Sequence, residues 1–276
     1  MKIRNISLFL VVVFLLVILL SACGNASSNN TTNTPTAANT VPTLKQGILQ
    51  VGIDNTYPPM EFPGDSGVNQ GFDIDVANAI AAKLGLKTEF VVTAWTGVFI
   101  GLDANKYDCI ISSLSINEDR KKSMAMTRPY AANSQVIVVK ADNNSIKTSA
   151  DFKGKIIGVQ LGTTAETACE SYVKTNPFTI KKYDAMTEAL MDLKIGRLDA
   201  VETDSVVGRY YVAQDKVSYK VMDAGLPSEP IGIGCKKENT KLMNMIDQTI
   251  VKLQNDGTLK TISEKWFGDD ITSNIK

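Results

Sequence analysis

The stretch GFDIDVANAIAAKLGL, residues 71–86, combines the pattern of an amphipathic helix with a stop signal. Apolar residues recur in it at four-residue steps, and a glycine follows the last of them: Phe72, Val76, Ile80, Leu84 and Gly85. This spacing places the apolar side chains on one helix face, and a glycine commonly ends such a helix. The preceding run ILQVGI, residues 48–53, has the composition of a buried strand. A strand followed by a helix is typical of a β-α-β unit.

The same alternation continues along the chain. We predict strands at 48–53, 88–93, 108–112, 135–140, 155–159 and 198–203. We predict helices at 72–84, 97–104, 117–123, 164–174, 185–195, 204–213, 241–256 and 258–266. This order indicates an α/β protein with mostly parallel sheets, in which ligands bind beyond the carboxyl ends of the strands.

The composition excludes several classes of function. The 29 basic residues equal the 29 acidic ones, so the basic surplus that nucleic-acid binding requires is absent. Histidine is missing from the sequence, which removes Ser-His-Asp catalysis and histidine-ligated zinc. The four cysteines form no C-x-x-C pair. We therefore expect no nucleic-acid partner, no metal and no cofactor.

The N-terminus has the pattern of a secretory signal. Lys2 and Arg4 precede an apolar run at 6–20, and Leu20-Ser21-Ala22-Cys23 resembles a bacterial lipobox, whose cysteine receives a diacylglyceryl group. We predict a signal peptide at 1–22, and a lipidated Cys23 with a flexible tether at 23–44 that is rich in Ser, Thr and Asn. The mature protein would then be extracytoplasmic and anchored to the cell membrane. The alternative is an ordinary secretory signal with a chance cysteine.

Polar residues follow the predicted strands, where a ligand is expected. Arg120 comes at about the third position of a helix capped by Asn117, where backbone N–H groups disfavour a cation. Thr163 and Glu166 have the spacing of a capping box at a second helix start. An arginine binds both oxygens of a carboxylate, and Asp204 supplies the opposite charge for an ammonium group. Together these residues predict a receptor for a zwitterion.

Several motifs carry a family resemblance, which spans about residues 46–268. They are GFDIDVANAIAAKLGL (71–86), TYPPMEF, LDANKYDCIISSLSINEDRKK, TRPY, DFKGKIIGVQLGTTAE, GRLDAVETD and EKWFG. With these motifs the chain resembles the bacterial extracytoplasmic solute-binding proteins of the polar amino-acid family (family 3), the receptors of amino-acid ABC importers. The resemblance implies a two-lobed periplasmic-binding-protein-like fold of type II, with two crossover segments and a cleft that closes on the ligand. One lobe would hold residues 45–131 and 231–276, and the other residues 132–230.

The resemblance also implies roles for individual residues. Arg120 would bind the α-carboxylate, with backbone support near Ser115 and Thr164, and Asp204 would bind the α-ammonium near Ser113. Tyr57 and Trp95 would wall the side-chain pocket, with Asp54 at its rim and Gln160 within reach of the ligand side chain. The full predicted set is Asp54, Tyr57, Trp95, Ser112, Ser113, Ser115, Arg120, Gln160, Thr163, Thr164 and Asp204.

Alternatives remain open at this stage. Arg120 could pair with an acid of its own helix, and Asp204 could merely cap the next helix. Glu202 lies two residues before Asp204 and so on the same strand face. If it reaches the cleft, a second carboxylate would favour arginine, lysine or cystine as the ligand.

For function, we expect a receptor that delivers an L-amino acid to the permease of an ABC transporter. An enzyme resembling cyclohexadienyl dehydratase, with Glu61 or Glu202 as its acid or base, is one alternative. An amino-acid-sensing module that signals to a membrane partner is the other.

Overall fold

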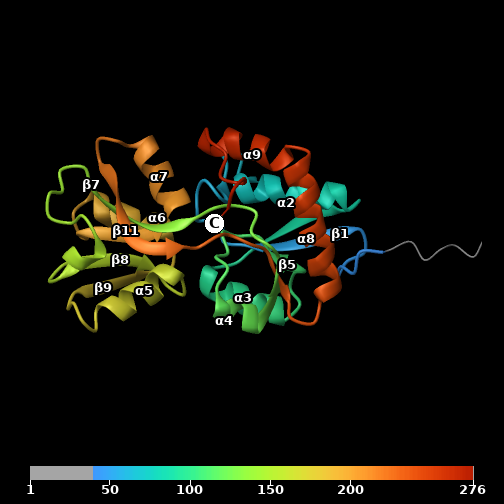
Figure 1. Cartoon of the computed structure of the whole chain (residues 1–276), viewed down its shortest axis with the longest axis horizontal. Helices are drawn as coiled ribbons and strands as arrows, with labels where there is room; N and C mark the ends of the chain where they lie inside the picture. The colour runs from blue at the N-terminus through green and yellow to red at the C-terminus, as the bar shows by residue number, and fades with distance from the viewer. Residues whose placement is uncertain (1–39, 276) are drawn as a thin grey trace, which may run out of the picture. The chain divides into compact units, whose positions relative to one another are not determined.

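Two five-stranded sheets organise the part of the chain that the computed structural model describes, residues 40–275. The first sheet has the order β4 (Lys87–Val92), β1 (Ile48–Ile53), β5 (Cys109–Ile110), β12 (Gly234–Lys236) and β6 (Met124–Met126). The second has the order β11 (Tyr219–Ser228), β7 (Ser134–Lys140), β10 (Ala200–Asp204), β8 (Ile156–Gln160) and β9 (Thr179–Tyr183). In Figure 1 the labelled strands of the second sheet lie at the left and those of the first at the right. We call these two parts lobe 2 and lobe 1.

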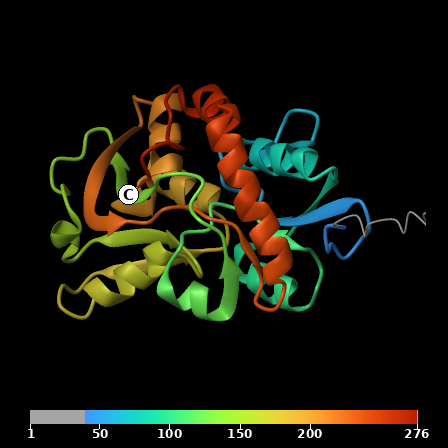
Figure 2. The same cartoon turned by 45° about the vertical axis from the view of Figure 1, so that its right-hand side comes forward.

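Helices cover both sheets. Lobe 1 carries α2 (Phe72–Lys83), α3 (Trp95–Asp103), α4 (Glu118–Ser123), α8 (Thr240–Asn255) and α9 (Thr258–Phe267), together with the short hairpin β2 (Phe62–Pro63) and β3 (Asn69–Gln70). Lobe 2 carries η1 (Ser149–Phe152), α5 (Thr164–Tyr172), α6 (Met186–Lys194) and α7 (Ser205–Gln214). The long α8, red-orange in Figure 2, passes in front of α2 and β1. Each predicted helix is present within two residues of its expected ends.

The apolar stripe of α2 explains its place in the core. Phe72, Val76 and Ile80 are completely buried, and α2 packs against α8 and α9. Asp73 in its first turn is also buried, and it accepts hydrogen bonds from the Ser113 N–H and the Tyr130 hydroxyl, both at 2.6 Å. This carboxylate therefore ties the helix start to the loop that follows β5.

Four of the five strands in each sheet run in the same direction, in agreement with the prediction of mostly parallel sheets, and one strand in each sheet is reversed. In the first sheet β1 is parallel to β4 and β5, but β12 is antiparallel to β5 and β6. In the second sheet β8 is parallel to β9 and β10, but β7 is antiparallel to β10 and β11. The reversed strands are β7 and β12, and each is the first strand after a connection between the lobes. Local alternation of strands and helices does not record that reversal.

Two crossover segments join the lobes, as expected from the family resemblance. One runs from β6 to β7 and the other from β11 to β12. They lie side by side, since Ala131 and Ile231 form an antiparallel bridge and the Glu229 N–H donates to the Asn133 carbonyl at 2.9 Å. The bounds proposed for the lobes, 45–131 with 231–276 and 132–230, remain a prediction.

The tether predicted at 23–44 extends too far toward the C-terminus. Leu44 donates its N–H to Asp108 Oδ1 at 2.6 Å, and the Asn239 side chain donates to the Pro42 carbonyl at 3.4 Å. Residues from Val41 onward belong to one compact unit with the rest of the chain. The signal peptide, Cys23 and most of the tether lie outside the described residues. Among residues 40–275, none of the helices has the length and apolar character needed to cross a membrane.

Candidate functional site

A cavity lies between the lobes, lined by residues of both. All eleven residues of the predicted set line it: Asp54, Tyr57, Trp95, Ser112, Ser113, Ser115, Arg120, Gln160, Thr163, Thr164 and Asp204. They come from the loops after β1 and β5, from the last residues of β8 and β10, and from the starts of α3, α4 and α5. Their contact with a ligand remains a prediction.

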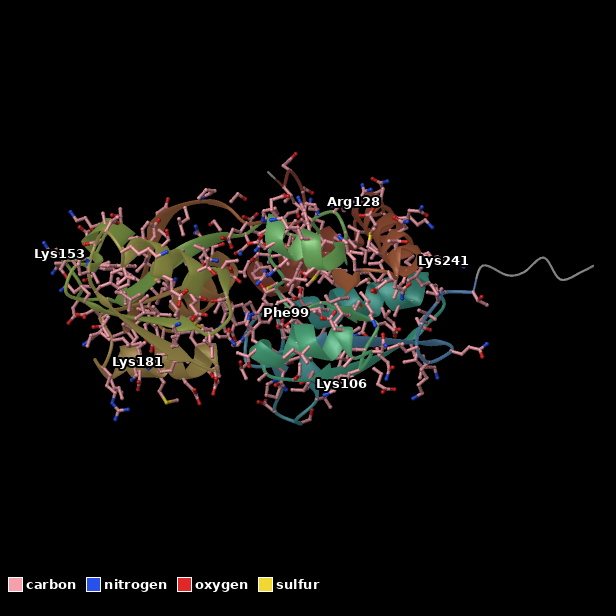
Figure 3. The ribbon with its side chains drawn as sticks, turned by 90° about the horizontal axis from the view of Figure 1, so that it is seen from below. Phe99, Lys106, Arg128, Lys153, Lys181 and Lys241 are labelled. Atoms are coloured by element: carbon pink, nitrogen blue, oxygen red, sulfur yellow. The ribbon has the colours of Figure 1, made fainter. Side chains whose placement is uncertain are left out.

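Arg120 is the cation of this cavity. Asn117 caps α4 by accepting the Arg120 N–H at 2.9 Å, and the guanidinium donates to the Ser115 carbonyl at 2.8 Å. The guanidinium carbon lies 5.5 Å from the ring centroids of both Trp95 and Phe99. Phe99 is labelled in Figure 3, near the border between the lobes. Aromatic rings at this distance attract a cation without neutralising it.

The interpretation of Arg120 as a partner of its own helix's acids is not supported. Among the described residues no carboxylate lies within 4.0 Å of its guanidinium, whereas its neighbours Lys121 and Lys122 pair with Glu118 and Asp119. Burial lowers the pKa of Arg120, while nearby carboxylates oppose that shift. Since an arginine side chain remains charged in proteins, the cavity contains an unpaired cation.

Asp204 is the principal acid of the cavity. It occupies the position before α7, but its side chain makes no capping bond. Instead, Oδ1 accepts from Asn133 at 2.6 Å and Gln135 at 2.8 Å, and Oδ2 accepts from Tyr57 at 2.9 Å and Ser113 at 3.3 Å. Burial is the largest influence and raises the pKa of Asp204, while these hydrogen bonds and Arg120 lower it. The helix-cap interpretation of Asp204 is therefore wrong.

Hydrogen bonds at the cavity cross from one lobe to the other, among them the bond from Ser113 to Asp204 and one between the Tyr57 and Thr203 hydroxyls at 3.2 Å. Tyr57 of lobe 1 donates to Asp204 of lobe 2, as described above. Gln160 Nε2 donates to Asp54 Oδ2 at 2.7 Å, and Trp95 Nε1 donates to the Gly162 carbonyl at 2.9 Å. The lobes are thus held together by side chains of the predicted set.

The start of α5 differs in detail from the predicted capping box. Thr163 Oγ1 accepts the Glu166 N–H at 3.3 Å, as expected. The Glu166 carboxylate accepts the Gly162 N–H at 2.5 Å and pairs with Lys182 at 2.5 Å. It therefore closes the loop one residue earlier than a standard capping box does. Thr164 follows the cap and donates its hydroxyl to Glu229 Oε2 at 2.7 Å.

Some lining residues were not among the predicted ligand contacts. Glu61 is buried beside Ser112, which donates to its Oε1 at 2.5 Å, and burial together with the charge of Asp73 raises the pKa of Glu61. Gln135 pairs with Asp204 across two antiparallel strands, a relation that no local sequence signal indicates. The others are Ala165, Met186 and Thr203.

The suggestion that Glu202 reaches the cleft is not supported. Its side chain is completely buried, accepts from the Cys169 thiol at 3.3 Å and is not among the lining residues. It shares a strand face with Asp204 but lies deeper in β10, where α5 packs on the strand. Its second oxygen has no hydrogen-bond partner within the described part of the chain, and burial raises its pKa to about 7. Over residues 40–275, no group of three or more Cys, Asp or Glu side chains could hold a metal ion.

Comparison with known proteins gives the same fold. The L-cystine-binding protein TcyJ of Escherichia coli (strain K12) is 34% identical over 229 residues, which are 83% of this chain and 85% of TcyJ. An ancestral arginine-binding protein bound to arginine superposes with a TM-score of 0.77 at 42% identity, covering 81% of this chain and 99% of that one. The ancestral amino acid-binding protein AncCDT-1, a precursor of cyclohexadienyl dehydratase, gives a TM-score of 0.75 at 36% identity, covering 80% of this chain and 96% of that one.

A family model matches most of the folded part. It describes the bacterial extracellular solute-binding proteins, family 3, and it matches residues 49–269. This range contains both sheets except the first residue of β1, and all eleven predicted residues of the cavity. The chain therefore belongs to the bacterial extracellular solute-binding proteins of family 3.

Proposed function

We propose that this protein is the receptor of an amino-acid ABC importer and binds an L-amino acid between its lobes. The observation that carries the proposal is the partly buried guanidinium of Arg120, which has no carboxylate of residues 40–275 within 4.0 Å, in the same cavity as Asp204. A free amino acid brings one carboxylate and one ammonium group, which complement these two charges. Burying such a ligand is favourable only if both of its charges are paired.

The α-carboxylate would bind at Arg120 and the start of α5. The guanidinium can present two parallel N–H groups to a carboxylate. The backbone N–H groups at the start of a helix such as α5 also favour an anion. The hydroxyl of Thr164 lies at this place and now donates to Glu229. The α-ammonium would bind near Asp204, the acid that complements Arg120 in this cavity.

The ligand side chain would extend toward Asp54, Gln160 and Tyr57. Asp54 is buried, and its Oδ2 accepts from Gln160. A cationic or polar group could take the place of the Gln160 amide at this carboxylate. L-Arginine is therefore the first candidate and L-cystine, with its second ammonium group, is the next. The names of the arginine-bound ancestral protein and of TcyJ support both.

Transport would follow from closure of the lobes. Ligand bound between them adds contacts to the closed form alone and so raises its population. A membrane permease would recognise this form. The proposed site of action is outside the cytoplasm, where a lipid on Cys23 would anchor the protein to the cell membrane.

An enzymatic role is the second candidate, because Glu61 lines the cavity with a raised pKa and AncCDT-1 is a structural neighbour. We infer that the cavity binds without reacting, since Ser112 and the nearby acid Asp73 engage Glu61 inside lobe 1. Incubation with prephenate or arogenate should leave the ultraviolet spectrum unchanged. Appearance of an aromatic product would contradict this inference.

The proposed function is tested by a thermal-shift screen with the common L-amino acids and L-cystine, followed by calorimetry on the positive compounds. A ligand at 100 times its Kd stabilises a protein by about 2.7 kcal/mol, which is a clear shift in Tm. We expect at least one L-amino acid to bind with a stoichiometry of one. If none of them raises the Tm, the proposed function is wrong.

A further inference from the structure

Gln135 lies directly opposite Asp204 at the end of the cavity. It is the second residue of β7, and its antiparallel partner in β10 is Asp204. Opposite residues of two antiparallel strands point to the same face of the sheet, so the two side chains lie together. Gln135 is 1% exposed and lines the cavity.

Three neighbouring acceptors fix the orientation of its amide. Gln135 Nε2 lies 2.8 Å from Asp204 Oδ1, 3.1 Å from Glu229 Oε2 and 3.1 Å from Thr164 Oγ1. The reversed amide would bring its carbonyl oxygen against two carboxylates and would be repelled by both. The nitrogen therefore faces the acids, and Oε1 faces the other way.

Gln135 Oε1 is left without a hydrogen-bond donor within the described part of the chain, although it is buried. Leaving a buried acceptor unsatisfied costs about 1–3 kcal/mol. In this structure each oxygen of Asp204 already accepts two hydrogen bonds. The side chain beside it thus offers the free acceptor at this end of the cavity.

We propose that Gln135 is a binding residue for the α-ammonium group of the ligand and that its Oε1 accepts one of the ammonium N–H groups beside Asp204. This inference rests on the proposed function and adds a residue to its ammonium site. The carboxylates of Asp204 and Glu229 lie 2.8 and 3.1 Å from Nε2 of the same amide, and their negative charges favour a cation near it. Gln135 would then distinguish amino acids from carboxylic acids that lack the α-amino group.

The test compares an amino acid with its deaminated analogue. The amino acid is the one that binds most tightly in the thermal-shift screen. For L-arginine the analogue is 5-guanidinopentanoic acid, and for L-cystine it is 3,3′-dithiodipropionic acid. Calorimetry measures both Kd values, and the ratio of interest is the Kd of the analogue divided by the Kd of the amino acid. This ratio is compared between the wild type and Gln135→Met, which keeps the length of the side chain and removes its carbonyl. We expect the ratio to fall at least tenfold in Gln135→Met, since a hydrogen bond to a charged group is lost only with the amino acid.

Asn133→Ala is the matched control. Asn133 also donates to Asp204 Oδ1, but it does not line the cavity. Its ratio should stay within threefold of the wild-type ratio. An unchanged ratio in Gln135→Met, or an equal fall in Asn133→Ala, would overturn the inference while leaving the proposed function intact. Gln135→Ala replaces Gln135→Met if the latter fails to fold, and absence of binding by the wild type would overturn both proposals.

Discussion

Replacing Arg120 with alanine removes the cation on which the proposed function depends. The guanidinium now donates to the Ser115 carbonyl and lies 5.5 Å from the ring centroids of Trp95 and Phe99, with no ion pair to a described residue. A bound carboxylate would therefore gain a fully charged and partly desolvated partner. In Arg120→Ala the same carboxylate would be buried beside two aromatic rings and without that partner.

The expected loss follows from the number of hydrogen bonds. Each charge-assisted hydrogen bond contributes about 1.5–3 kcal/mol, and a guanidinium can make two of them to one carboxylate. We expect Arg120→Ala to weaken binding by at least about 3 kcal/mol, which is roughly a 150-fold rise in Kd. Arg120→Lys should recover only part of this loss, because an ammonium group keeps the charge and lacks the planar fork.

Calorimetry with the tightest ligand of the screen measures the effect. Lys121→Ala is the matched control, because Lys121 is the next residue of α4, is exposed and pairs only with the exposed Glu118. Its Kd should equal that of the wild type. The ligand-free Tm of Arg120→Ala should stay within a few degrees of the wild type, since two cation–π contacts of about 0.5–1 kcal/mol are lost. A Kd for Arg120→Ala within threefold of the wild type would refute the reasoning.

Three further predictions concern other parts of the molecule. Ligand binding should change the tryptophan fluorescence, and Trp95→Phe should abolish this change while Trp266→Phe retains it, because of the two tryptophans only Trp95 lines the cavity. The stability of the wild type should fall as the pH rises from about 4.5 to about 7, because the buried Glu202 keeps its proton over this range when folded and loses it when unfolded. Glu202→Gln should remove the part of this slope that Glu202 contributes, up to about 3 kcal/mol at pH 8, whereas the part contributed by Glu61 and Asp204, whose pKa values are also raised, should remain. An identical slope of Tm against pH in both proteins would contradict the assignment. Tyr57→Phe removes a hydrogen bond to Asp204 that crosses between the lobes, so the ligand-free protein should have a larger radius of gyration in X-ray scattering, and an unchanged radius would show that this bond does not hold the lobes together.

Much of the fold could be predicted from local patterns. The apolar spacing of 241–256 predicts a helix, and the structure has one at Thr240–Asn255. The run at 135–140 predicts a strand, and the structure has one at Ser134–Lys140. The short strands at Phe62–Pro63, Asn69–Gln70 and Met124–Met126 were not predicted. Three further strands were also missed, at Thr179–Tyr183, Tyr219–Ser228 and Gly234–Lys236. The first is mostly polar and exposed, and the last is only three residues long. Their positions depend on pairing with distant strands, which local patterns do not encode.

The candidate site shows the same division. Residues that follow strands, such as Asp54 and Asp204, could be placed in the cavity because strand ends meet at one edge of a sheet. The alternation of side chains along a strand assigns Glu202 to the correct face of β10. The same alternation does not indicate whether a helix covers that position and separates it from the cavity. Gln135 was missed because it is at the start of its strand and meets Asp204 only through antiparallel pairing.

The two oxygens of Asp204 have different partners, and this difference bears on how a ligand could enter. Oδ1 accepts from Asn133 and Gln135, which lie at the crossover and in lobe 2, so these bonds can persist when the lobes separate. Oδ2 accepts from Tyr57 and Ser113 of lobe 1, and both bonds must break on opening. Opening would therefore expose one oxygen of a carboxylate whose orientation is still fixed by the other. A carboxylate held in this way loses little conformational entropy when an ammonium group binds, which reduces one of the costs of association.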